Sequence, residues 1–409
     1  MIDSRASSRI HGFGTSIFTE MSLLATKYNA VNLGQGFPDF AGPDFVKEAA
    51  RIAIAENKNQ YAPSHGVPRL RQAIAETWAN DYQREIDVER EITVTSGATE
   101  AIFAAIQAFV GPGDEAITFE PCYDSYEPSV QMAGGTLRAV TLRPPSWSFD
   151  RAELVAAFGP KSRVLLLNTP HNPTGKVFTA AELQVIADLC HEHDVIAITD
   201  EVYDRIVFDA AVHVPLATLP GMWERTLTIN STGKTFSMTG WKIGYAVGAA
   251  PLNAALRAVH QFVTFASATP LQEAMATAMG VAVERGYYGQ LKAEYGQRRD
   301  LLRAALDENG LPVLPVAGSY FLLADLSGLE VADDVEFCRT LTIEAGVAAV
   351  PPSAFYIDRT RAPKLARFCF AKRDETLRSA ADRLAQWRGS AETAATAAST
   401  GLAGDGRPL

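Results

Sequence analysis

The sequence predicts an α/β protein in which helices flank a mainly parallel central sheet, followed by a smaller α+β domain. Several short runs of leucine and β-branched residues are apolar throughout, which is typical of strands buried on both faces. These runs are residues 92–95, 116–119, 164–167, 195–199 and 226–229. Helical patterns, such as residues 100–110 and 180–191, lie between the runs. This alternation of strand and helix favours a doubly wound parallel sheet.

The chain is predicted to fold in four parts. Residues 43–280 carry the alternating pattern and form the large domain. Residues 281–389 give helices around a strand-like run, as in a smaller domain, and residues 1–42 are expected to pack against that domain. Residues 390–409 are rich in alanine, threonine and glycine without periodicity, so we expect a disordered tail.

Composition argues against several classes of function. The 409 residues carry a formal net charge of -10 without a basic run, so nucleic acid and anionic membranes are poor partners. The four cysteines are far apart and form no C-x-x-C pair, which indicates neither a disulfide framework nor a metal site. No stretch has the pattern of a secretory signal or the length to span a bilayer, so we expect a cytoplasmic protein.

Two nucleotide-binding motifs are incomplete. Gly233-Lys234-Thr235 could end a P-loop, but that motif needs a glycine at position 228. Thr228 stands there, and a β-branched residue cannot make the required tight turn. The G-x-G sequences at residues 34–36 and 111–113 both lack the third glycine of a dinucleotide-binding loop. Lys234 therefore needs another explanation.

Polar residues follow the predicted strands where a parallel sheet places its ligands, just beyond the carboxyl ends. In chain order these are Ser96-Gly97-Ala98-Thr99, residues 168–175, Asp200 with Tyr203, and Ser231 with Lys234 and Lys242. Each has an ordinary explanation as a helix cap, a turn or a surface residue. Together they match the needs of pyridoxal phosphate, namely a lysine for a Schiff base, a carboxylate for the pyridine nitrogen and a phosphate site.

The motifs carry a family resemblance. The pattern Asn168-x-Pro-His-Asn172-Pro173-x-Gly175, then Asp200-Glu201-Val202-Tyr203, then Ser231-x-Gly-Lys234-x-Phe-x-x-Thr-Gly240-Trp241-Lys242-x-Gly244 resembles the class I/II aminotransferases. These are pyridoxal phosphate enzymes of fold type I, and the resemblance runs from about residue 32 to 388. Residues 33–40 and 367–372 look like the branch of kynurenine, glutamine and methionine aminotransferases. Residues 333–338 and the Ser-Gly-Ala-Thr sequence look most like its bacterial methionine aminotransferases.

The resemblance implies roles for the cofactor-binding residues. Lys234 would form the Schiff base and, once released as a neutral amine, shuttle the substrate α-proton. Asp200 would pair with the pyridinium, Asn172 and Tyr203 would bind the ring oxygen, and Tyr123 would stack on the ring. The phosphate would be bound by Gly97, Ala98, Thr99, Ser231 and Lys242, with Tyr61 entering from a second subunit. A homodimer with shared sites is therefore expected.

The resemblance also implies a substrate site. Arg367 would bind the α-carboxylate, helped by Asn172 and the backbone of Gly36. The side-chain pocket would be lined by aromatic residues: Phe37, Tyr123, Phe265 and Phe355. Such a pocket favours methionine and other long or aromatic neutral L-amino acids, tolerates glutamine and disfavours aspartate, with a 2-oxo acid as acceptor.

The sequence departs from the family pattern at one position, and two alternatives to an aminotransferase remain open. Kynurenine-acting members of the branch carry a histidine where this chain has Ala266, which argues against kynurenine as the main substrate. A β-lyase that cleaves a C–S bond would use the same scaffold and the same proton abstraction. A catalytically silent protein of this fold is the other alternative, although Lys234, Asp200, Asn172 and Arg367 are all present.

Overall fold

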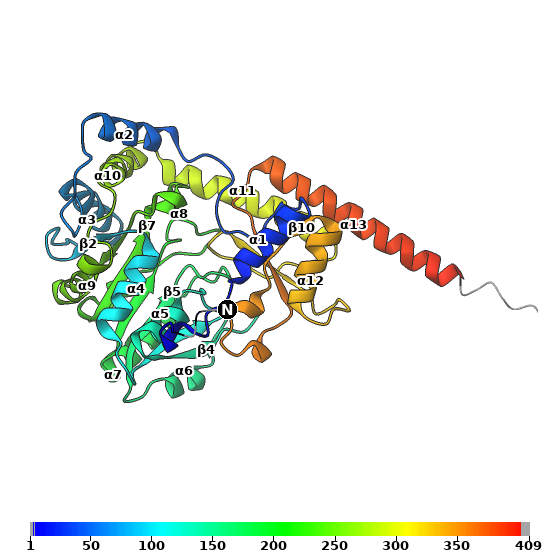
Figure 1. The fold of residues 1–409 in the computed structure, drawn as a ribbon, viewed down its shortest axis with the longest axis horizontal. Coiled ribbons are helices and arrows are strands. Elements are labelled where there is room, and N and C mark those ends of the chain that lie inside the picture. The colour runs from blue at the N-terminus through cyan, green and yellow to red at the C-terminus, as the bar shows by residue number, and fades with distance from the viewer. Residues whose placement is uncertain (1–2, 4, 402–409) are drawn as a thin grey trace, which may run out of the picture.

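The computed structural model describes residue 3 and residues 5–401, and its larger part is built on a seven-stranded sheet (Figure 1). The strand order is β2-β8-β7-β6-β5-β3-β4, and only β8 runs antiparallel to its neighbours. The predicted α/β fold is confirmed. The strands are β2 Ile92–Thr95, β3 Glu115–Glu120, β4 Thr136–Thr141, β5 Ser162–Asn168, β6 Ile196–Asp200, β7 Thr226–Ser231 and β8 Gly244–Val247.

Alternate residues of the central strands enter two different cores. Ile117 and Leu165 pack with α7 on one face, whereas Ala116 and Leu166 pack with α4, α5 and α9 on the other. Both faces are covered, which is why these strands are apolar throughout. The helices of this part are α2 Asp44–Ala55, α3 Pro68–Tyr82, α4 Ala98–Phe109, α5 Tyr126–Ala133, α6 Arg151–Ala157, α7 Ala180–Glu192, α8 Thr232–Thr235, α9 Ala250–Val263 and α10 Thr269–Glu284.

The smaller part has its own core around an antiparallel pair of strands, β9 Phe321–Asp325 and β11 Leu365–Cys369. The N-terminal segment joins it, because β1 Val31–Asn32 pairs in parallel with β10 Val347–Ala348. Figure 1 shows α1 in blue beside α12 and β10. The helices here are α1 Ile17–Lys27, α11 Tyr287–Glu308, α12 Asp334–Thr340 and α13 Asp374–Gly401.

The last helix enters the segment for which the sequence predicts a disordered tail. α13 ends at Gly401 and extends away from the body of the protein in Figure 1. Disorder of residues 390–409 stays a prediction. Alanine is the best helix former, which is consistent with a helix through this alanine-rich segment. The remainder of the predicted tail, residues 402–409, lies outside the described residues.

Two further observations bear on the composition. None of the helices in the described part of the chain is long and apolar enough to cross a bilayer. All four cysteines, Cys122, Cys190, Cys338 and Cys369, are buried and unpaired.

Candidate active site

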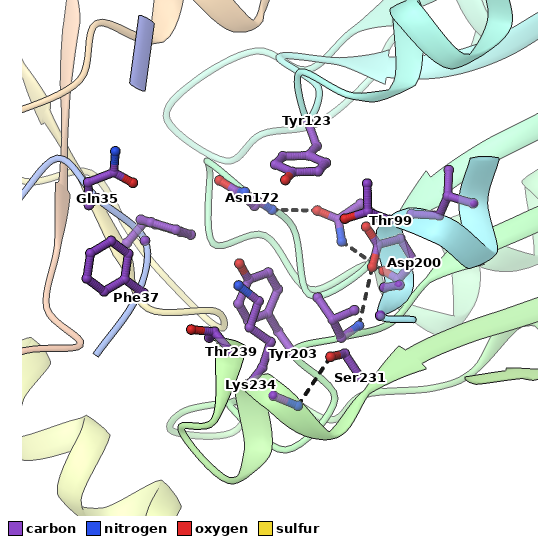
Figure 2. Close-up of a pocket in the computed structure, with 18 of the residues that line it drawn as sticks. Gln35, Phe37, Thr99, Tyr123, Asn172, Asp200, Tyr203, Ser231, Lys234 and Thr239 are labelled. Carbon is purple, nitrogen blue, oxygen red and sulfur yellow. Dashed lines mark hydrogen bonds between the residues drawn. The ribbon is translucent and has the colours of Figure 1, made fainter. Parts of the chain in front are cut away.

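A cavity of about 350 Å³ opens at the carboxyl ends of the parallel strands. The register of the sheet brings its walls together, since Asn168 at the end of β5 pairs with Asp200 at the end of β6. In Figure 2, Gln35 and Phe37 of the N-terminal segment face Lys234 and Tyr203 from the opposite side of this cavity. The site therefore lies between the carboxyl edge of the sheet and the N-terminal segment.

Lys234 is presented by α8, a single turn directly after β7. Ser231 caps this turn, and its Oγ accepts a hydrogen bond from the backbone N–H of Gly233 at 3.2 Å. Burial lowers the pKa of Lys234 to about 8; Asp200 opposes this shift, and the cations Lys242 and Arg367 add to it. A substantial fraction of this amine is neutral near pH 8, as a nucleophile or base requires.

Asp200 is a buried carboxylate at the end of β6. Its Oδ2 accepts a hydrogen bond from the hydroxyl of Tyr126 at 2.7 Å. Burial raises the pKa of Asp200 to about 6, although the Tyr126 hydrogen bond acts in the other direction. Tyr203, three residues on, is also buried, and burial raises the pKa of its phenol, which keeps its proton at neutral pH.

The N-terminus of α4 and two side chains form an anion-binding corner. Gly97 is the N-cap residue of α4 with φ 82°, a conformation that favours glycine, and Ala98 and Thr99 begin the helix. A Cβ at Gly97 would lie 3.2 Å from Lys242 Nζ, so this ammonium sits directly over the glycine. Helix N-terminal N–H groups beside a cation are suited to phosphate.

Arg367 lies at the centre of β11 and is only 1% exposed. Its Nη1 donates to Asn172 Oδ1 at 3.0 Å and its Nη2 donates to the carbonyl of Gly34 at 2.9 Å. The guanidinium lies over the ring of Phe321, 4.1 Å from the centroid. Its Nε has no hydrogen-bond partner among the described residues. Burial lowers the pKa of Arg367, and the carboxylate of Asp124 is among the groups that oppose this shift.

The structure brings most of the predicted site residues into this one cavity. Those that line it are Gly36, Phe37, Gly97, Ala98, Thr99, Tyr123, Asn172, Asp200, Tyr203, Ser231, Lys234, Lys242 and Arg367. The Asn172–Pro173 peptide bond is cis.

Three predicted residues lie elsewhere. Tyr61 is 86% exposed and packs edge-on against Phe265, which is 48% exposed, so the two rings form a surface contact. Phe355 is buried with its ring 5.0 Å from the Arg367 guanidinium, and within this subunit it is not a lining residue. It therefore supports the arginine rather than forming the pocket wall.

Sequence patterns missed other residues at the site. Gln35, Thr239 and Phe321 line the cavity, and Tyr126 and Tyr320 bond to Asp200 and Lys234 from behind. The two tyrosines lie in α5 and just before β9, so no local motif connects them with the site. Both side chains are buried, and burial is not visible in a sequence.

Comparison with known proteins identifies the family. The family model described as aminotransferase class I and II matches residues 28–384. The chain belongs to the class I and II aminotransferases. As an aminotransferase of this family it is a pyridoxal phosphate-dependent enzyme, and the predicted fold type is confirmed.

Several relatives cover almost the whole chain. A methionine aminotransferase of Escherichia coli is 45% identical over 379 residues, which is 93% of this chain and 97% of the relative. The mouse kynurenine–oxoglutarate transaminase 3 is 42% identical over 406 residues, 93% and 89% of the two chains. The solved structure of an N-succinyldiaminopimelate aminotransferase from Mycobacterium tuberculosis superposes with a TM-score of 0.90 at 45% identity. The match covers 93% of this chain and 100% of that one.

Proposed function

We propose that this aminotransferase moves the amino group of a neutral L-amino acid (sulfur-containing, aromatic or glutamine-like) to a 2-oxo acid, with pyridoxal phosphate bound at Lys234. The observation that carries the proposal is the cavity that holds Lys234, Asp200 and Arg367 together. The methionine aminotransferase among the relatives supports a neutral amino donor. The buried, unpaired cysteines support a cytoplasmic location.

The chemistry of the donor set fits the cofactor. Pyridoxal phosphate supplies an aldehyde that bonds an amine and a pyridine ring that accepts electrons from the substrate. Lys234 provides the amine, and Asp200 provides a buried carboxylate that would stabilise a protonated ring nitrogen. The corner formed by residues 97–99, Ser231 and Lys242 would bind the phosphate, and Tyr123 would cover the ring face.

Asn172 connects the cofactor site with the substrate site. Its Oδ1 accepts from Arg367, which leaves its Nδ2 free to donate to the ring oxygen, together with the protonated hydroxyl of Tyr203. Arg367 then retains donors for a substrate carboxylate, with the backbone of Gly36 beside it. Lys234 Nζ takes the proton from the substrate α-carbon and returns it during the transfer.

The walls of the cavity favour a neutral side chain. Phe18, Phe37 and Phe321 line it, and among the described lining residues Arg367 is the only arginine. Each buried methylene gains roughly 0.8 kcal/mol against such walls, whereas a second carboxylate would lack a partner. We infer that methionine, phenylalanine and related amino acids are preferred, that aspartate is poor, and that kynurenine is weak because of Ala266.

A two-fold dimer completes the proposal. Tyr61 and Phe265 are exposed on one subunit, and Phe262, which precedes Phe265 in the sequence at the end of α9, is 86% exposed. In the dimer, Tyr61 would reach the phosphate of the neighbouring site and Phe265 its side-chain pocket. Two equivalent sites would then each use residues of both subunits.

The test begins with the lysine. Holoenzyme treated with borohydride should retain the cofactor covalently on Lys234, as peptide mass spectrometry would show. Lys234→Ala should lose amino transfer, whereas the exposed Lys161→Ala should not. Substantial transfer by Lys234→Ala would overturn the assignment.

The substrate is tested by half-reactions. Purified holoenzyme is mixed with methionine, phenylalanine, glutamine, kynurenine or aspartate, and loss of the visible absorbance of the bound cofactor is followed. Methionine and phenylalanine should react fastest. Aspartate as the best donor would refute the pocket assignment. With a cysteine S-conjugate, whose sulfur is on the β-carbon, release of pyruvate, ammonia and a thiol would indicate a β-lyase.

A further inference from the structure

Tyr320 contacts Lys234, and nothing in the proposed function uses it. Its hydroxyl accepts a hydrogen bond from Lys234 Nζ at 2.9 Å and donates one to the carbonyl of Gly36 at 2.5 Å. The side chain is fully buried. Its ring is held between Tyr295, stacked at 6.0 Å, and Tyr203, edge-on at 5.0 Å. Tyr320 is therefore a fixed link between the lysine and the backbone of the substrate site.

The hydrogen-bond directions constrain the lysine amine. A phenol has one proton, and a carbonyl oxygen can only accept, so the Tyr320 proton is committed to Gly36. Burial raises the pKa of Tyr320, so the phenol does not ionise. Only oxygen lone pairs remain for Lys234, which must use an N–H for this contact. The lone pair of a neutral amine is then left unused.

We propose that Tyr320 is a positioning residue for the proton transfer, holding the released Lys234 amine by an N–H so that its lone pair stays available to the substrate α-carbon. The proposal rests on the proposed function. Lys234 Nζ gains the α-proton as an additional N–H, the electrons of the broken C–H bond stay with the conjugated substrate, and Tyr320 keeps its own proton. The hydrogen bond from Tyr320 to Gly36 fixes the position of the Lys234 amine relative to the substrate carboxylate.

The first experiment uses cofactor-free protein and does not depend on turnover. Acetic anhydride labelling of Lys234 is followed across pH by peptide mass spectrometry, in wild type and in Tyr320→Phe. A hydrogen-bond acceptor stabilises the ammonium more than the amine, so its removal should lower the labelling midpoint by about one pH unit. The matched control is Tyr295→Phe, a buried tyrosine in the same aromatic cluster that makes no hydrogen bond to Lys234.

The second experiment uses holoenzyme with methionine and α-deuterated methionine. Tyr320→Phe should lower kcat by about ten- to hundredfold with a smaller change in KM, because a misplaced base slows proton removal. The deuterium isotope effect on kcat should increase, since proton removal becomes more nearly rate-limiting. Tyr295→Phe should match the wild type in both measurements.

The outcomes separate the two proposals. If wild-type holoenzyme transfers no amino group, the proposed function fails. If the wild type is active and Tyr320→Phe equals Tyr295→Phe in labelling midpoint and isotope effect, the role of Tyr320 is overturned and the function stands. Should Tyr320→Phe not fold, 3-fluorotyrosine at position 320 keeps the shape and weakens the acceptor. The 3-fluorotyrosine variant should lower the pH midpoint of Lys234 labelling by less than Tyr320→Phe would. An unchanged midpoint would equally overturn the positioning role of Tyr320.

Discussion

At the scale of single residues, Arg367 donates hydrogen bonds from both Nη1 and Nη2, and a substitute side chain would have to match this geometry. The guanidinium reaches Asn172 and Gly34 at once and would still present N–H donors to a carboxylate. Arg367→Lys provides one point charge instead, so we expect a loss of about 2–4 kcal/mol in kcat/KM with cofactor affinity unchanged. The exposed Arg359→Lys serves as the control. Near-normal kcat/KM for Arg367→Lys would assign the carboxylate to another residue.

Asp200 illustrates what the site costs in stability. Its folded pKa of about 6 exceeds the ordinary 3.8, so the unfolded chain ionises first and stability falls as pH rises from about 4 to 6. Above pH 6 the ionised, buried Asp200 lowers the free energy of unfolding by its full amount. At 1.36 kcal/mol per pKa unit, this amount is at most about 3 kcal/mol. Cofactor-free Asp200→Asn should therefore be the more stable protein at pH 7.5, with an advantage that shrinks towards pH 4. Urea unfolding at both pH values tests this, and equal stability at pH 7.5 would contradict it.

At the scale of elements, α7 is a scaffold that can be weakened without touching the site. Thr179 and Glu182 form a reciprocal capping box at its N-terminus. Thr179→Ala should cost about 1 kcal/mol of unfolding free energy and leave kcat/KM unchanged. Thermal unfolding and the methionine assay measure the two effects. A parallel loss of activity would show that α7 is coupled to the cavity.

The elements also show where sequence patterns succeed. The ranges predicted for β5 and β7 lie within two residues of the observed bounds, because the apolar or β-branched runs 164–167 and 226–229 are buried on both faces. β4 was missed because its exposed edge carries Thr136 and Arg138 between buried residues, and β8 because it begins with Gly244. The chemistry at strand ends was predictable since each residue follows its strand in sequence. Tyr126 and Tyr320 reach the site only through tertiary packing.

At the scale of the whole molecule, the exposed ring of Phe262 offers a direct test of the proposed dimer. The proposed dimer would bury Phe262, and a charge introduced there would be desolvated without a partner on association. Phe262→Asp should therefore yield a folded monomer with little activity, while Lys161→Ala remains dimeric. Sedimentation velocity with parallel assays measures both. A fully active monomer would contradict shared sites.

The buried guanidinium of Arg367 has a consequence for the energetics of the whole fold. Burial lowers its pKa, and the nearby Asp124 opposes this only in part, so a bound substrate carboxylate would stabilise the charged guanidinium. Substrate and product then act as structural ligands, and folding becomes linked to metabolite concentration. At one hundred times Kd, a 2-oxo acid with an uncharged side chain, whose ionised carboxylate would pair with Arg367, should add about 2.7 kcal/mol to the unfolding free energy. The resistance of the enzyme to unfolding would thus rise with the supply of its own substrates.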